Sequence, residues 1–259
     1  MKKRKLLLLS ACLSVSCASQ NAPQEIVSYL NGCSINKAFE QTKTISYSFT
    51  SNLYEEETKL GETSLSVYWD NSKSDDFYEY QKEEYTGSNI SYDEEKNLYV
   101  TSKEIYSYLD QDDSLYHKVT YYKGYEKEET ESEIKTIRYS DVKYQPSQFN
   151  SEKEVIFRSQ STSGISKGGV YYGDFFSNLL SYYPYMSIQD DLFVYTLSDY
   201  PYKNSDEEGI INEVARMNSL GLLVELTQTA KNTKTKKTSR LDVKVSYNIN
   251  IERVNKPED

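Results

Sequence analysis

Three cysteines, Cys12, Cys17 and Cys33, carry the side chains best suited to covalent modification. Cys17 follows a basic segment, Met1–Lys5, and a stretch of apolar or small residues, Leu6–Ser16. A basic start, a short apolar run and small residues before a cut site are typical of a secretory signal peptide, which is removed and adds nothing to the fold. The apolar stretch is shorter than the roughly 20 residues that a membrane-spanning helix needs. The sequence therefore predicts an exported chain with a cysteine at the cut site.

The segment Leu13–Cys17 resembles the lipobox of bacterial lipoproteins, in which the thiol is lipidated before cleavage. The resemblance implies a diacylglyceryl group on Cys17, with acyl chains such as palmitate that hold the protein to a membrane, facing outside the cytoplasm. Each buried CH2 contributes about 0.8 kcal/mol, so two or three chains anchor firmly and one anchors weakly. Cys12 is an alternative, because Leu9–Ala11 fits the lipobox more closely, but it leaves only six apolar residues after Lys5, below the roughly 7–15 of a signal peptide. An ordinary secretory signal with incidental cysteines is the remaining alternative.

Side chains for catalysis or metal binding are few. His117 is the only histidine, which excludes a multi-histidine zinc site, and we expect it at the surface of a strand. A Gly-x-Ser-x-Gly nucleophile elbow is absent, and Ser166–Gly169 indicates a turn, not a phosphate-binding loop. Asp110, Asp112 and Asp113 lack the glycine and the closing glutamate of a calcium loop. We predict no catalytic residue, no metal and no cofactor, with an envelope hydrolase built on paired carboxylates as an alternative.

Charge and length limit the class of protein. The 259 residues carry a net charge of −10, and removal of the four basic residues of the signal segment would make it about −14. So acidic a surface repels a phosphate backbone, which argues against a nucleic-acid partner. After cleavage at Cys17, Cys33 is the only thiol, and we expect it to be a half-buried apolar residue in a helical segment. The length suits one large domain. We therefore predict a signal peptide at 1–16, a lipidated tether at 17–23 and a single α+β domain at 24–255.

Tyrosine is unusually frequent, with 26 Tyr against 8 Phe and one Trp, a composition that favours strands and half-wet surfaces. Helical spacing predicts two short helices within 24–44, interrupted at Asn31 and Gly32, with Ser34 as the cap of the second. Alternation of apolar and polar residues at 45–50, 65–69 and 241–251, together with Tyr-rich or apolar runs elsewhere, predicts many strands. They lie at 45–50, 65–69, 77–85, 98–100, 116–125, 134–144, 155–157, 192–197, 210–217, 222–229 and 241–251.

A longer helix is predicted from Asp174 to Tyr183, because its apolar residues recur at helical spacing and Pro184 follows. An amphipathic helix must lay this apolar face on the sheet. We therefore predict that one group of its side chains lies near the mouth of a ligand cavity: Phe175, Phe176, Leu179 and Leu180.

The order of elements predicts an α+β fold, mostly an antiparallel β-sheet that is half-open and barrel-like, with a few helices packed on one face. This layout resembles the lipoprotein-carrier fold of LolA, LolB, LppX and LprG. The resembling segments are Ala38–Phe49, a helix end that runs into a first strand, and Leu220–Leu226, a turn followed by Gly-Leu and a strand. The resemblance implies an unclosed β-barrel with helices at its mouth and a cavity for acyl chains.

These observations predict a non-enzymatic, membrane-anchored bacterial surface lipoprotein that binds or presents a lipid or an envelope partner. The alternative is a glycan-binding or adhesive surface module, because exposed tyrosine rings can stack on sugars. The candidate rings for this alternative are Tyr78, Tyr80, Tyr85, Tyr92, Tyr121, Tyr122, Tyr171, Tyr172, Tyr182, Tyr183 and Tyr185.

Overall fold

The structure is a computed structural model, which describes residues 22–42, 44–70, 78–109, 116–126, 135–144, 169–203 and 208–248. The chain forms two compact units. The first unit comprises Met1–Ala38 and Val155–Thr238, and the second comprises Phe39–Glu154 and Ser239–Asp259. Within the described ranges, no helix is long and apolar enough to cross a membrane.

The first unit contains four strands that pair antiparallel in chain order. They are β8 (Met186–Gln189), β9 (Leu192–Lys203), β10 (Glu208–Met217) and β11 (Leu223–Asn232). The β8–β9 turn is made by Asp190 and Asp191, both with positive φ (49° and 63°), as a two-residue hairpin turn requires. After β10, the Asn218 side-chain oxygen accepts the N–H groups of Leu220 (3.0 Å) and Leu222 (3.1 Å) and so fixes the next turn.

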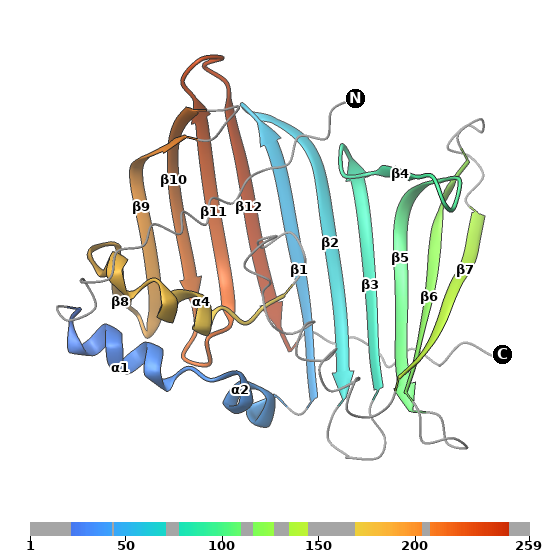
Figure 1. The fold of residues 1–259 in the computed structure, drawn as a ribbon, viewed down its shortest axis with the longest axis horizontal. Coiled ribbons are helices and arrows are strands. Elements are labelled where there is room, and N and C mark those ends of the chain that lie inside the picture. The colour runs from blue at the N-terminus through green and yellow to red at the C-terminus, as the bar shows by residue number, and fades with distance from the viewer. Residues whose placement is uncertain are drawn as a thin grey trace. The chain divides into compact units, whose positions relative to one another are not determined.

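Short helices accompany this sheet. They are α1 (Gln24–Gly32), α4 (Gly173–Asn178) and the 3-10 helix η3 (Leu180–Tyr185). α1 contacts α4 and β8, and η3 contacts β8 and β9 (Figure 1). α1 buries Ile26 and Leu30. A further helix, α2 (Ile35–Gln41), runs across the boundary between the two units.

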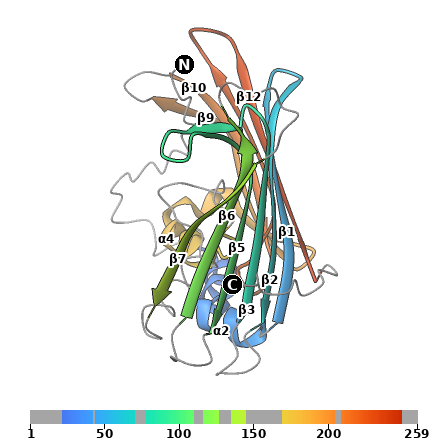
Figure 2. The ribbon, with the colours of Figure 1, turned by 90° about the vertical axis from the view of Figure 1, so that its right-hand side faces the viewer.

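The second unit is a sheet of long antiparallel strands. Its members are β1 (Thr44–Glu55), β2 (Thr58–Asp70), β3 (Tyr78–Gly87), β5 (Leu98–Leu109), β6 (Tyr116–Tyr125), β7 (Lys135–Tyr144) and β12 (Thr238–Tyr247). Within the unit the spatial order is β7-β6-β5-β3-β2-β1-β12, and the short β4 (Ser91–Asp93) pairs with β5. Figure 2 views this sheet from its β7 end.

One face of the second sheet changes from apolar to polar across its width. On β1 and β2 it carries Phe49 and Val67, both buried. On β3 the position opposite Val67 is Gln81, and the same face carries Glu79. Both polar side chains are buried, and the Gln81 amide donates a hydrogen bond to the Glu79 carboxylate (2.7 Å). A buried carboxylate must be hydrogen-bonded or paired, and this amide supplies one such bond.

The predicted class, mostly antiparallel sheet with few helices, is confirmed. The strand predicted at 116–125 has those bounds, and the two short helices within 24–44 are present as α1 and α2. The strand predicted at 155–157 lies outside the described residues. The single helix predicted from Asp174 is wrong in its length: α4 ends at Asn178, and the chain continues as the 3-10 helix η3. Pro184 lies inside η3, where its ring disfavours α geometry at Leu180 and Tyr183. It accounts for the absence of an α-helix over 180–183 but not for the end of α4 at Asn178.

Candidate functional site

The candidate site is the helix-facing side of the first unit's sheet, which we call the inner face. It carries Phe193 and Tyr195 on β9, Ala215 and Met217 on β10, and Leu226 on β11. Strand register places Tyr195 opposite Ala215, Phe193 opposite Met217, and Ala215 opposite Leu226. All five side chains are buried. Side chains alternate between the two faces of a strand, so these residues form one continuous apolar surface.

Phe176 joins the helices to the inner face. Its ring lies 5.0 Å from that of Phe193 and 5.5 Å from that of Tyr195, measured between centroids, and only 2% of the residue is exposed. Phe175 packs edge-on against Phe176 at 5.1 Å and against Tyr172 at 6.2 Å, and it is half-buried. The two neighbouring phenylalanines therefore differ: Phe176 is a core residue, whereas Phe175 keeps part of its surface open.

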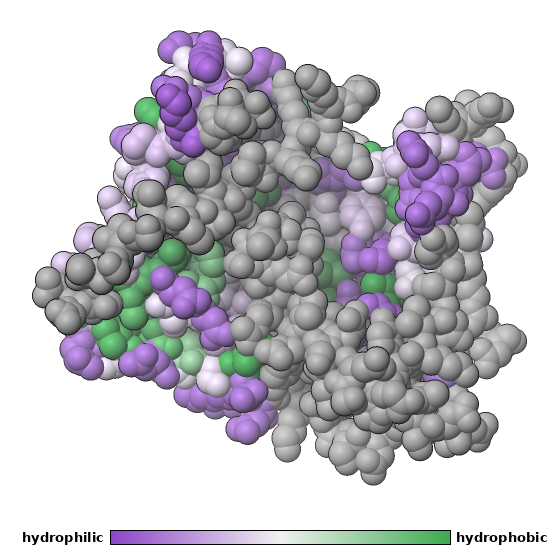
Figure 3. Space-filling model, viewed as in Figure 1, coloured by the Kyte–Doolittle hydropathy of each residue, from purple (hydrophilic) through white to green (hydrophobic). Residues whose placement is uncertain are grey.

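Leu179 and Leu180 are also half-buried, but they lie where α4 gives way to η3. Leu179 has φ −99° and ψ 17°, which breaks the α-helical path. The four predicted cavity residues thus fall in one continuous segment, but they do not form a single α-helical stripe. Figure 3 shows hydrophobic atoms on this side of the unit, in the region where Figure 1 places α1 and α4.

Two further sets of hydrogen bonds fix this layer in place. The Tyr29 hydroxyl on α1 lies 3.2 Å from the carbonyl oxygens of Asp191 and Met217, and it accepts the N–H of Phe193 at 3.3 Å. The segment before α4 is held by β-type bonds, from the N–H of Leu223 to the carbonyl of Val170 and from the N–H of Tyr172 to the carbonyl of Gly221, both 2.7 Å. These bonds tie α1 and α4 to strands distant in sequence, so the helices are firmly positioned over the sheet.

The inner face also contains one carboxylate, Glu213 on β10, two residues from the buried Ala215 and two from the buried Ile211. Gln228 lies directly opposite on β11, and its amide donates to a Glu213 oxygen at 2.6 Å. Burial raises the pKa of Glu213, and the Gln228 hydrogen bond partly opposes that rise. Sequence reasoning missed this pair, although a glutamate at an inward position of the alternating Ile-x-Glu-x-Ala-x-Met pattern is a visible signal.

A tyrosine on the neighbouring strand lies close to this carboxylate in the register. Tyr195 is diagonal to Glu213 across the β9–β10 register, because Glu213 faces Leu197 and Ala215 faces Tyr195. Long side chains at diagonal positions can reach each other. The pKa of Tyr195 is raised, first by burial and then by Glu213, with smaller effects from three more tyrosines. These are Tyr182 and Tyr185 of η3 and Tyr200 of β9.

The tyrosines predicted for a glycan platform do not share a face. Tyr80, Tyr171 and Tyr172 are buried, and of that set only Tyr185, at 38%, is exposed among the described residues. Tyr78 has a described backbone only. The others are half-buried on different strands and helices. In the described ranges, these rings therefore do not form one exposed surface of the kind that the glycan alternative requires.

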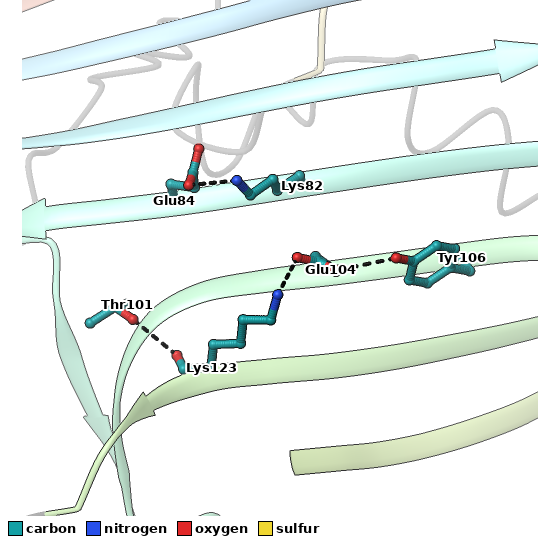
Figure 4. Close-up of polar contacts among 6 residues, drawn as sticks. All are labelled: Lys82, Glu84, Thr101, Glu104, Tyr106 and Lys123. Atoms are coloured by element: carbon teal, nitrogen blue, oxygen red, sulfur yellow. Dashed lines mark hydrogen bonds and ion pairs between the residues drawn. The ribbon is translucent and has the colours of Figure 1, made fainter. Parts of the chain in front are cut away.

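In the second unit, the tyrosines form packed clusters instead. Tyr80 and Tyr106 are buried together, with ring centroids 5.0 Å apart, and Tyr121 meets Tyr106 edge-on at 5.9 Å. The Tyr106 hydroxyl donates to Glu104 (3.1 Å), which also pairs with Lys123 (2.6 Å), as Figure 4 shows. Burial raises the pKa of Tyr80 to about 12, with smaller effects from nearby glutamates. These rings serve the packing of the sheet.

The remaining predicted residues have separate outcomes. Cys17 and the Asp110–Asp113 cluster lie outside the described residues. The surface position expected for His117 is wrong: the residue is 8% exposed, and its ring stacks on Tyr108 at 5.5 Å. Cys33 is half-buried as expected, and burial raises the pKa of its thiol to about 11. Among the described side chains, no group of three or more His, Cys, Asp or Glu is placed to hold a metal ion.

Comparisons with known proteins give distant likenesses. No protein-family model matches the chain, and no curated protein matches it. Among solved structures, a DUF1329 family protein from Desulfovibrio piger aligns at 11% identity and a TM-score of 0.26, covering 88% of this chain and 95% of that one. A LolA superfamily protein from Nitrosomonas europaea aligns at 8% identity and a TM-score of 0.18, covering 87% and 92%.

Proposed function

We propose that the protein is a lipid-anchored, non-enzymatic bacterial surface protein that binds a lipid or an apolar envelope ligand on the α4–η3 layer of its first unit. The observation that carries this proposal is the difference in burial between Phe176, which is buried, and Phe175, which is half-buried. Phe176 closes the layer onto the inner face, whereas Phe175, Leu179 and Leu180 keep accessible apolar surface beside it. Covering apolar surface is favourable by about 25 cal/mol per Å², so an acyl chain laid along these residues would be held.

The anchor belongs to the same proposal, and it is supported by the sequence alone. A basic segment, an apolar run and a cysteine at the cut site would place a lipid on Cys17 and the folded units outside the cytoplasm. Two or three acyl chains on one residue are enough for stable membrane attachment.

Native mass spectrometry tests ligand binding. The chain is expressed from residue 18 without its anchor and measured under native conditions. We expect an added mass that corresponds to a lipid or an acyl ligand. The same sample is then incubated with vesicles of bacterial envelope lipid, which supply a ligand, and its mass is measured again. Failure to acquire any lipid in both measurements contradicts the binding proposal.

Labelling with an alkyne analogue of palmitate tests the anchor separately. In a bacterial host, the wild-type chain and Cys12→Ser should incorporate the label, whereas Cys17→Ser should not. Label that is lost in Cys12→Ser and kept in Cys17→Ser would move the anchor to Cys12. Absence of label from all three chains contradicts lipidation.

A further inference from the structure

An uncharged segment forms the accessible part of the helix layer in the first unit. The fifteen residues Phe175–Gln189 include no Asp, Glu, Lys, Arg or His, although 27% of the chain is charged. Among their side chains, Phe175, Leu179 and Leu180 are half-buried, and Tyr185 is exposed. Such a surface offers apolar contact and carries no charge of its own, so it suits an aliphatic chain.

The helix α1 lies beside this segment. Just after α1, Cys33 lies against Gly173, the first residue of α4: a Cβ atom added to Gly173 would come within 2.8 Å of Cys33 Cβ. α1 also contacts β8, which follows η3 in the chain. Figure 1 shows the first turn of α1 on the side of the unit where β8 lies. α1 therefore spans the layer from β8 to the start of α4, and the chain enters α1 at the β8 end.

The predicted lipidation site is close to this end of α1 in the sequence. Cys17 lies five residues before Ala22, the first described residue, and five extended residues span at most about 17 Å. α1 has nine residues and is about 14 Å long. The tether is thus as long as the helix that spans the layer. An acyl group on Cys17 can therefore reach the α4–η3 layer of the same molecule.

Attachment to the same chain favours this acyl group over a free ligand. A group on a short flexible linker has an effective concentration in the millimolar range at a site within its reach. A free ligand of equal affinity must reach that concentration before it occupies half of the sites. The acyl group of the chain itself is therefore the occupant that the layer meets first.

We infer that an acyl chain on Cys17 lies on the α4–η3 layer of the same molecule whenever the protein is away from a membrane. This arrangement rests on the proposed function of the layer and on lipidation of Cys17. A bilayer surrounds an acyl chain, whereas the layer covers it from one side, so anchoring in a membrane removes the chain from the layer. The site is closed in the free protein and open to other apolar ligands in the anchored protein.

Chemical alkylation tests this inference without depending on lipidation in a cell. Residues 17–259 with Cys33→Ser contain Cys17 as the only thiol, which is alkylated with N-dodecylmaleimide or, as the reference, with N-ethylmaleimide. Calorimetric titration with dodecyl maltoside, below its micelle concentration, measures access to the layer. The ethyl form should bind the maltoside. The dodecyl form should bind it about tenfold more weakly, as expected for a group with a Kd of about 0.1 mM at an effective concentration of about 1 mM.

A dodecyl group beyond reach of the layer is the matched control. Lys234 is exposed in the turn after β11. The other end of β11 is Leu223, whose N–H bonds to the carbonyl of Val170 before α4, and a strand of this length spans about 30 Å. The control chain carries Cys17→Ser, Cys33→Ser and Lys234→Cys. Its ethyl and dodecyl forms should bind the maltoside equally.

Amide hydrogen exchange locates the attached chain. In the dodecyl form at Cys17, exchange should be slower within residues 175–185 than in the ethyl form, and it should be unchanged in β11. Slower exchange elsewhere, with none at 175–185, would place the chain on another surface and overturn the inference.

The remaining outcomes separate this inference from the proposed function. If the ethyl and dodecyl forms at Cys17 bind the maltoside equally, the inference is wrong while the apolar site stands. The same holds if the dodecyl group at Lys234→Cys weakens binding as much, or if the effect at Cys17 disappears on dilution of the protein, because contact between molecules then explains it. If the ethyl form does not bind the maltoside, the apolar site and the inference both fail.

Discussion

Gly221 lies against the ring of Tyr171, so closely that a Cβ atom added to Gly221 would come within 2.7 Å of Tyr171 Cε2. Gly221 also has φ +81°, a conformation that L side chains rarely adopt. Gly221→Ala should therefore destabilise the first unit, both through backbone strain of about 1–3 kcal/mol and through displacement of the Tyr171 ring. Urea unfolding followed by circular dichroism measures the change.

Gly32→Ala is the matched control for that substitution. Gly32 ends α1, and a Cβ atom there would meet nothing within 4 Å. Because alanine is the better helix former by up to about 1 kcal/mol, the control should be neutral or slightly stabilising. Equal destabilisation by both substitutions would contradict the role given to the Gly221–Tyr171 contact.

Tyr29→Phe should loosen α1 from the sheet. The substitution removes the hydroxyl that contacts two backbone carbonyls and accepts the Phe193 N–H. A buried donor left without its acceptor costs about 1–3 kcal/mol. Amide hydrogen exchange should therefore speed up in α1 and at Phe193 and change little in β11. Exchange that rises uniformly across the unit would mean that the bond supports global stability and not the docking of α1.

Substitutions of Phe175 and Phe176 should have different effects, one mainly on ligand affinity and the other mainly on the free energy of unfolding. Truncating a fully buried phenylalanine costs about 3–5 kcal/mol, so Phe176→Ala should strongly lower the free energy of unfolding. Phe175 is half-buried, and Phe175→Ala should cost less while reducing the affinity for dodecyl maltoside. Chemical denaturation and calorimetric titration of both variants give the two quantities. A Phe175→Ala chain that binds with parental affinity would remove this residue from the ligand site.

The features that sequence predicted well are those set by local periodicity. The alternating residues 45–50 lie within β1, β6 has the predicted bounds, and the two short helices follow from the break at Gly32. The Glu213–Gln228 bond, in contrast, depends on the register between β10 and β11. A single sequence does not specify the register between strands, so the hydrogen bond between these two side chains could not be predicted from it. The burial of His117 escaped prediction for the same reason, since its stacking partner Tyr108 lies on another strand.

The stability of the fold should depend on the protonation of Glu213. Burial raises its pKa above the ordinary value of 4.5, so the folded chain holds this proton to higher pH than the unfolded chain. The resulting stabilisation is fully present below the unfolded pKa and is lost as pH rises through the folded pKa.

Glu213→Gln removes this pH dependence, because an amide does not titrate. The free energy of unfolding of the variant should therefore increase relative to that of the parent as pH rises above the ordinary glutamate pKa of 4.5. The difference should become constant once Glu213 is ionised in the folded parent. Urea midpoints at a series of pH values measure the difference. A difference that is independent of pH would mean that Glu213 has the same pKa in both states.

Cys33 should react slowly in the folded protein. Burial raises the pKa of its thiol from 9.0 to about 11, an effect that Lys37 partly opposes. The thiolate is the reactive form, and two pKa units correspond to about a hundredfold less thiolate at a pH near 8. Alkylation by iodoacetamide, measured in the chain with Cys12→Ser and Cys17→Ser, should be about a hundredfold slower in buffer than in denaturant. Similar rates in the two conditions would show that α1 and the 218–222 turn leave this thiol open to solvent.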